Sequence, residues 1–292
     1  MQITEALDLF QLQLRANGRS AHTQNQYARH VRMLDAWFAL SSRSRDLRDV
    51  DHVAVSEFLC SAAVVEKRGG GRRRATSANG LRSSLRSFFG WAHAAGYAHR
   101  NAAALVQRAR CAPAPPRGLS EGDQRRLLDE LAQATDPEGQ RDHTLFAVML
   151  GAGTRVGSAV ALDLEDVDLE RSELRLRTTK GDRPALAILP RSVAAVLRRY
   201  IADRTEGALF QGRRGDRITT RHVARRLAYW LRRAGIERRA SPHSLRHSFA
   251  RRVFEKTGDL LLTQAALGHA SVMSTVVYAR VDRERLRAVL QE

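Results

Sequence analysis

Apolar residues in the first 110 positions recur at helical spacing and predict a bundle of four or five helices. The first helix is expected after a Thr4 cap, the second after Ser20 and Thr23, and the fourth is expected to end near Gly96. Short helices are stable only when such faces pack together, so one compact bundle is expected. The apolar faces are Leu7, Phe10 and Leu14; Tyr27, Val31, Leu34 and Phe38; Val55, Phe58 and Leu59; and Leu81, Leu85, Phe88 and Ala92.

A proline-rich stretch then interrupts the pattern. Residues 111–118 contain three prolines within four positions, which favours an extended linker. Ser120 follows as a helix N-cap with acidic residues in the first turn behind it. The sequence therefore predicts a first domain over 1–110 and a second over 119–292.

Residues 119–292 are predicted to be mainly helical with one small sheet. Segment 174–177 alternates apolar and charged residues as a half-buried strand does, and residues 179–182 form its turn. A short tail helix over 282–290 places Leu286, Val289 and Leu290 on one face. The expected fold class is thus mainly α, with three short antiparallel strands. The strands are expected at 167–169, 174–177 and 185–188, and the main helices at 191–205, 218–234, 243–256 and 260–266.

The charge balance points to a polyanionic partner. The chain has 49 Lys+Arg against 31 Asp+Glu, a net charge of +18. Residues 1–110 hold 17 basic and 8 acidic residues, giving +9, and the remaining 32 and 23 also give +9. Both domains would face the same polyanion, such as DNA, although a coding bias toward arginine would also enrich basic residues.

A basic, glycine-rich segment separates the third and fourth predicted helices. Its three consecutive glycines disfavour helix, and its cations cannot be buried together. We expect a mobile loop that contacts DNA phosphates, with a solvated connector as the alternative. The predicted DNA-binding residues are Lys67, Arg68, Arg72, Arg73 and Arg74.

Compartment signals are few. The two cysteines, Cys60 and Cys111, have no metal-ligand spacing and suit a reducing compartment. Neither a secretion signal nor an apolar run of membrane-spanning length is found in the sequence, so a cytoplasmic protein without a membrane partner is expected.

One predicted helix start resembles an anion site. Ser241 is a suitable cap and Pro242 suits the first helical position. His243 and Arg246 follow three residues apart and share a face beside the positive end of the helix. Arg246 could hold a phosphate and His243 could transfer a proton. By itself this spacing also fits a capped surface helix with solvated charges.

Four more residues complete a candidate site. Arg155 follows a glycine-rich turn, Lys180 lies in the predicted turn between strands, and Tyr278 lies nine positions after His269. A tyrosine that attacks a phosphodiester needs cations to stabilise the phosphate and a donor to protonate the leaving oxygen. Each residue also has an ordinary structural interpretation, as a surface arginine, a solvated turn lysine or a core tyrosine.

Together these motifs resemble the tyrosine recombinase family, which includes the phage integrases and Xer proteins. The resemblance rests on Arg155, on Leu245–Ala250, on Leu267-Gly268-His269 with Ser271, and on Tyr278. The usual family pattern around the first arginine is Gly-Leu-Arg-x-Ser-Glu. Here Thr154, Gly157 and Ser158 replace its leucine, serine and glutamate, which puts the orientation of Arg155 in question.

The resemblance implies a SAM-like core-binding bundle followed by a catalytic domain. It assigns Tyr278 as the nucleophile, Lys180 as the general acid, and Arg155 and Arg246 as the phosphate clamp, with His243 and His269 assisting. The implied reaction is a transesterification through a 3′-phosphotyrosyl intermediate, without cofactor or metal.

The implied partner is double-stranded DNA carrying a specific recombination site. In the family, protomers form a tetramer on DNA, either homo- or hetero-tetrameric, and the C-terminal tail docks on a neighbour; an accessory activator protein is left open. The layout is closer to Xer-type recombinases, with a mobile-element integrase also fitting. Two alternatives are a topoisomerase IB-like enzyme and a relative that binds DNA but has impaired catalysis.

Overall fold

The computed structural model describes residues 1–67, 69–111, 118–177 and 185–268. Two compact units, residues 1–112 and 113–292, are each considered by themselves below. Arg68, Lys180, His269, Tyr278 and the expected tail helix fall outside the described residues. No helix within the described ranges is long and apolar enough to cross a bilayer.

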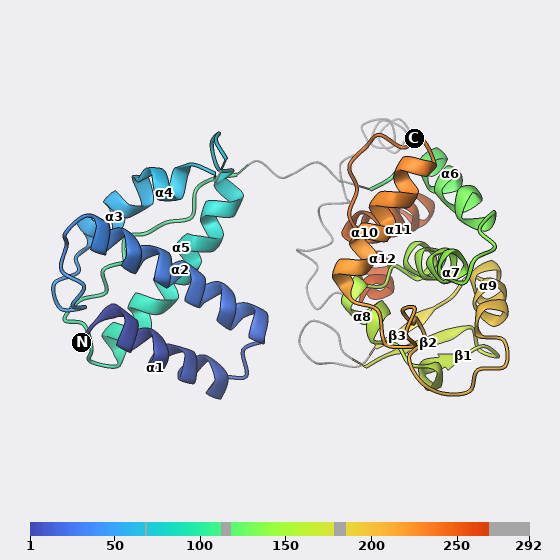
Figure 1. Ribbon diagram of the computed structural model, residues 1–292, viewed down its shortest axis with the longest axis horizontal. Coiled ribbons are helices and arrows are strands. Elements are labelled where there is room, and N and C mark those ends of the chain that lie inside the picture. The colour runs from blue at the N-terminus through green and yellow to red at the C-terminus, as the bar shows by residue number, and fades with distance from the viewer. Residues whose placement is uncertain (68, 112–117, 178–184, 269–292) are drawn as a thin grey trace, which may run out of the picture. The chain divides into compact units, whose positions relative to one another are not determined.

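The first unit is a helical bundle, as predicted (Figure 1). All four predicted apolar faces pack into one core, where the Phe10 ring lies edge-on to that of Phe88 with centroids 5.5 Å apart. The predicted fourth helix corresponds to α5. The helices are α1 (Ile3–Ala16), α2 (Ala21–Leu40), α3 (His52–Cys60), α4 (Ala62–Val65) and α5 (Ala75–Ala94).

Two details of this bundle differ from the sequence prediction. The first helix begins before Thr4, with Gln2 as its N-cap and the Gln2 amide donating to Glu5 Oε2 at 2.8 Å. This earlier start is stabilised by residue 45, whose carbonyl accepts from the Ile3 amide at 3.0 Å. The four-residue helix α4 was not predicted, because so short a segment shows no helical periodicity.

The basic segment after α4 forms a closed turn. The Lys67 amide donates to the Gly71 carbonyl at 2.9 Å, and Glu66 pairs with Arg72 in an isolated antiparallel bridge. Its three glycines have φ between 80° and 95°, a region that favours glycine. Lys67, Arg72 and Arg74 are exposed, so they remain available to a polyanion.

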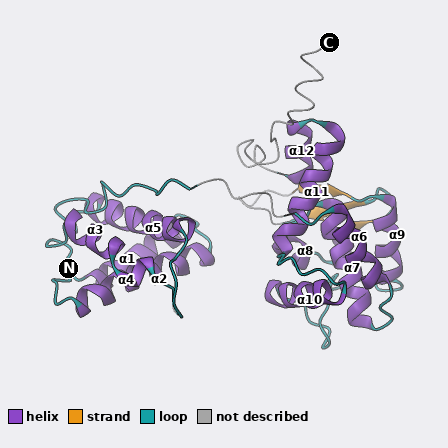
Figure 2. Cartoon of the chain, turned by 90° about the horizontal axis from the view of Figure 1, so that it is seen from above, coloured by secondary structure: helices purple, strands orange, loops and turns teal. Residues whose placement is uncertain are grey.

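The second unit packs helices around the long, buried α7, with a small sheet at one side (Figures 1 and 2). The sheet is antiparallel, as predicted, with the strand order β1-β2-β3 and Leu174 opposite both Val167 and Ala187. Helix α9 ends earlier than predicted, at Ile201, because Ala202 has a φ of 48°. The elements are α6 (Glu121–Ala132), α7 (Pro137–Ala152), α8 (Val156–Ala161), η1 (Leu164–Asp166), β1 (Val167–Asp168), β2 (Glu173–Leu176), β3 (Ala185–Ile188), α9 (Arg191–Ile201), α10 (Thr220–Arg233), α11 (Pro242–Thr257) and α12 (Leu260–Leu267).

A buried histidine joins two helices of the first unit. His30 on α2 is 7% exposed, and its Nδ1 lies 2.8 Å from the Ser84 hydroxyl on α5. Burial, together with the positive charges of Arg29 and Arg73, lowers the pKa of His30 from 6.5 to about 4. In the folded protein the His30 imidazole is therefore mostly neutral above about pH 4.

We expect the stability of the first unit to fall as the pH decreases from about 6.5 to 4. Between these pH values His30 binds a proton in the unfolded chain but not in the folded chain, so acid favours unfolding. The free energy of unfolding should fall by up to about 3 kcal/mol, and His30 should cause no further loss below pH 4. Denaturant titrations across this range should show that His30→Gln lacks this pH-dependent component, whereas the exposed control His22→Gln retains it. An unchanged pH dependence in His30→Gln would contradict the assignment.

Candidate active site

The turn between α7 and α8 determines where Arg155 lies. Helix α7 ends at Gly153, which has a left-handed φ of 61°. A Cβ atom at Gly153 would lie 2.2 Å from the Phe249 ring of α11, so both the backbone conformation and the packing require glycine. Thr154 follows, and Arg155 is the N-cap residue of α8, half-buried. The glycine-rich sequence thus turns the chain sharply and holds it against α11.

Helix α11 carries His243 and Arg246 in its first two turns. It begins at Pro242 after the predicted Ser241 cap, whose amide donates to the Ser244 hydroxyl at 3.1 Å. Arg246 is 6% exposed, and its guanidinium donates to the Gly153 carbonyl at 2.6 Å and to the Leu267 carbonyl. Arg246 therefore joins the α7–α8 turn to the end of α12.

Arg155 and Arg246 line the same small pocket. Thr154 and Ser158 also line it, and its volume of about 10 Å³ is room for about one oxygen atom. The other walls come from the ends of β2 and β3 and from the end of α12. These lining residues are Ala152, Leu176, Ala185, Leu186, Ala187, Ala266, Leu267 and Gly268.

Residues next to two segments that contain predicted site residues also line the pocket. Leu176 and Ala185 lie on either side of the segment that contains Lys180. Gly268 immediately precedes His269. His243 does not line the pocket but lies one helical turn before Arg246.

The electrostatics of this region favour an anion. Burial lowers the pKa of Arg155, which forms no ion pair with any carboxylate in the described part of the chain. His243 is an exposed residue, but its imidazole ring is partly buried. This partial burial is the main cause that lowers the pKa of His243, and the positive charges of Arg246 and Arg155 lower it further. A phosphate bound here would offset that positive charge and would draw the pKa of His243 back up.

Two contacts anchor α11 within the unit. The Leu119 amide, at the start of the unit, donates to the Ser248 hydroxyl at 2.7 Å. Arg252 donates to the Leu150 carbonyl near the end of α7 at 2.6 Å. The helix that bears His243 and Arg246 is thus fixed to the segment before α6 and to α7.

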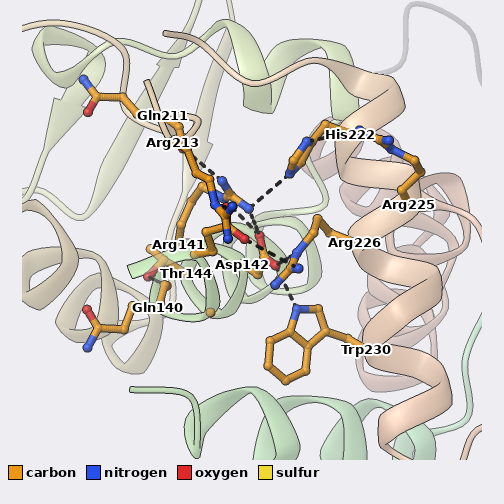
Figure 3. Close-up of polar contacts among 12 residues, drawn as sticks. Gln140, Arg141, Asp142, Thr144, Gln211, Arg213, His222, Arg225, Arg226 and Trp230 are labelled. Atoms are coloured by element: carbon orange, nitrogen blue, oxygen red, sulfur yellow. Dashed lines mark hydrogen bonds and ion pairs between the residues drawn. The ribbon is translucent and has the colours of Figure 1, made fainter. Parts of the chain in front are cut away.

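A buried polar network attaches α10 to α7 (Figure 3). Asp142 on α7 is 1% exposed, and its carboxylate accepts from the Arg141 and Arg226 guanidiniums and, at 2.8 Å, from the Trp230 indole. Arg141, 2% exposed, also donates to the Gln211 carbonyl at 3.1 Å. Sequence reasoning gave these residues no role. The signal in the sequence was an Arg-Asp pair that lies two residues before the apolar stretch beginning at Leu145.

Comparison with known protein families gives two matches that together cover most of the chain. Residues 118–285 match the phage integrase family, and residues 7–96 match the N-terminal SAM-like domain of phage integrases. Among curated proteins, tyrosine recombinase XerC of Chromobacterium violaceum is 31% identical over 291 residues, covering 98% of this chain and 93% of the relative. XerC of Salmonella typhi is 33% identical over 267 residues, covering 89% and 86%.

Solved structures share the fold at lower identity. The XerH site-specific recombinase bound to its difH substrate has a TM-score of 0.72 at 23% identity, covering 91% of this chain and 78% of that chain. A lambda integrase dimer bound to a COC′ core site also gives 0.72, at 18% identity, covering 93% and 96%.

Proposed function

The chain belongs to the phage integrase family of tyrosine recombinases, and on that premise we propose that it is a site-specific DNA recombinase that cuts and rejoins duplex DNA. The observation that carries this function is the shared pocket of Arg155 and Arg246, lined by residues that adjoin the segments of Lys180 and His269. Two arginines at one narrow, cation-rich site suit a phosphate diester, whose negative charge increases as it is attacked.

In the proposed reaction the Tyr278 oxygen attacks the scissile phosphorus. The bond to the 5′ oxygen breaks as the bond to the tyrosine forms, leaving a 3′-phosphotyrosyl link. Lys180 protonates the departing 5′ oxygen, because a lysine pKa can be adjusted into the useful range whereas arginine stays protonated. The 5′-hydroxyl of a partner strand then attacks the phosphotyrosyl link and releases Tyr278. Each step exchanges one phosphodiester for another, so no external energy source is needed.

The remaining site residues stabilise the phosphate. Arg155 and Arg246 bind its non-bridging oxygens, and His269 donates to one of them. The pKa of His243 is lowered by partial burial and by both arginines, which favours the neutral imidazole that can accept or relay a proton. Ser158 stands where the family pattern has a glutamate; it is buried and lines the same pocket as Arg155.

The proposed substrate is double-stranded DNA with a specific site. Exposed Lys67, Arg72 and Arg74 in the first unit are proposed phosphate contacts, together with Arg68 and Arg73. We further propose a tetramer on DNA, linked through the tail after Tyr278, acting on cytoplasmic DNA. The related proteins that share most of the chain are named XerC, which favours an Xer-type enzyme over a mobile-element integrase.

Recombination between two sites distinguishes this function from its alternatives. The site would be found by selecting genomic fragments that become covalently attached to the protein. A plasmid carrying two direct copies should be resolved into two circles. A topoisomerase IB-like enzyme would only relax the plasmid, and a catalytically impaired relative would bind it without forming an adduct.

We expect Lys180→Ala to slow cleavage by about 10²- to 10⁴-fold, the usual contribution of a general acid. A substrate with sulfur in place of the 5′ bridging oxygen should restore the rate, because a thiolate leaves without protonation. Arg155→Ala serves as the control, since it removes charge stabilisation that sulfur does not replace. If the sulfur substrate fails to rescue Lys180→Ala, Lys180 is not the acid.

A further inference from the structure

Thr154 carries a buried hydroxyl that the fold itself does not use. The side chain is 1% exposed, and its Oγ1 has no hydrogen-bond partner among the described residues. Other buried hydroxyls of this unit are satisfied within their helices: Thr144 donates to the Gln140 carbonyl at 2.9 Å and Thr263 to the Asp259 carbonyl at 2.7 Å. Thr154 lies between α7 and α8, where it makes no such bond.

The position of this hydroxyl is set by its neighbours. Gly153 is held in its left-handed conformation against Phe249, and its carbonyl accepts from Arg246. Arg155 follows directly as the N-cap residue of α8. Thr154 therefore lies between the carbonyl that Arg246 contacts and Arg155 in the chain, and it lines the pocket that both arginines line.

The chemistry of the pocket selects the group that Thr154 would bind. A buried hydroxyl without a partner destabilises a protein, so a hydroxyl kept at this position is explained by a ligand atom that accepts its proton. The two guanidiniums can donate hydrogen bonds but cannot accept one, so the acceptor for the Thr154 hydroxyl has to come from a ligand, and an anionic oxygen suits the positive charge of both arginines. The pocket has room for about one such atom.

We propose that the Thr154 hydroxyl donates a hydrogen bond to one non-bridging oxygen of the scissile phosphate, between Arg155 and Arg246. This rests on the proposed function and adds a third substrate contact to the arginine clamp. Because charge on that oxygen increases during attack, the contact strengthens in the transition state and accelerates cleavage.

The test compares Thr154→Val, which keeps the shape but removes the hydroxyl, with Thr154→Ser, which keeps the hydroxyl. Covalent adduct formation is followed with a nicked suicide substrate carrying oxygen, or sulfur in either of the two stereochemical positions, at the scissile phosphate. Valine should slow cleavage of the oxygen substrate about ten- to a hundredfold, and serine by less than about threefold. Thermal stability of Thr154→Val should be unchanged or higher, since no partner is lost.

The sulfur substrates separate substrate contact from a structural role. In the wild type, sulfur at the one position that faces Thr154 should slow cleavage more than sulfur at the other position. This difference in rate should disappear in Thr154→Val. Equal rates for valine and wild type, or a slow valine variant that keeps the full stereochemical preference, would overturn the proposal. A wild-type protein that forms no adduct would instead overturn the proposed function.

Discussion

Replacing Tyr278 with phenylalanine is expected to abolish the covalent protein–DNA adduct while leaving site-specific binding intact. The change removes only the attacking oxygen, so cleavage should fall by at least ~10⁴-fold, as when other enzymes lose their nucleophile. Affinity should persist, because it comes from the arginines and the net charge of +18. A suicide substrate resolved on a denaturing gel measures the adduct, and a gel-shift assay measures binding.

Tyr229→Phe provides the matched control. Tyr229 lies on α10 beside Arg233 and is half-buried, so removing its hydroxyl leaves the proposed chemistry in place. Its adduct yield should equal that of the wild type. An adduct that persists in Tyr278→Phe would assign the nucleophile to another residue and would remove the basis of the proposed mechanism.

Asp142→Ala is expected to destabilise the second unit by about 3–5 kcal/mol, a typical effect of removing one partner from a buried ion pair. The substitution leaves Arg141 buried at 2% exposure without its counter-ion and breaks the contacts of Arg226 and Trp230. Denaturant unfolding, followed through Trp230 fluorescence, measures the change.

Asp168→Ala tests whether this effect depends on burial. Asp168 on β1 forms an exposed ion pair with the Arg171 guanidinium at 3.9 Å and accepts from the Arg171 backbone amide at 2.8 Å. Because both contacts are exposed, its loss should change the free energy of unfolding by only about 1–2 kcal/mol. If the two substitutions cost the same, the Asp142 network does not hold α10 against α7.

Helical periodicity was sufficient to predict the bundle and most helices, and the alternation of apolar and charged residues indicated the second strand, because each element has a face that must be buried. It was insufficient where an element is too short or where its end depends on a distant contact. Helix α4 spans about one turn, and α9 ends early at Ala202, after which Arg204 places its guanidinium 4.8 Å from the centre of the Tyr200 ring. The start of α1 depends on the carbonyl of residue 45.

The candidate site was only partly accessible from sequence. Motif spacing singled out Arg155, His243 and Arg246, but only the structure shows that the two arginines share a pocket. Asp142 was missed because charged residues are ordinarily expected at the surface, and its partners on α10 lie more than 80 positions away. The sequence likewise could not show that the Thr154 hydroxyl lacks a hydrogen-bond partner, because this depends on which groups surround it in the folded protein.

The hydrogen bond between Leu119 and Ser248 couples the position of α11 to the start of the second unit. The chain enters the second unit at Leu119, and Ser248 is two residues after Arg246 on the same helix. The first described residues of the second unit and the helix that carries Arg246 are therefore bonded directly to each other, so a substitution that displaces Leu119 is also expected to displace α11.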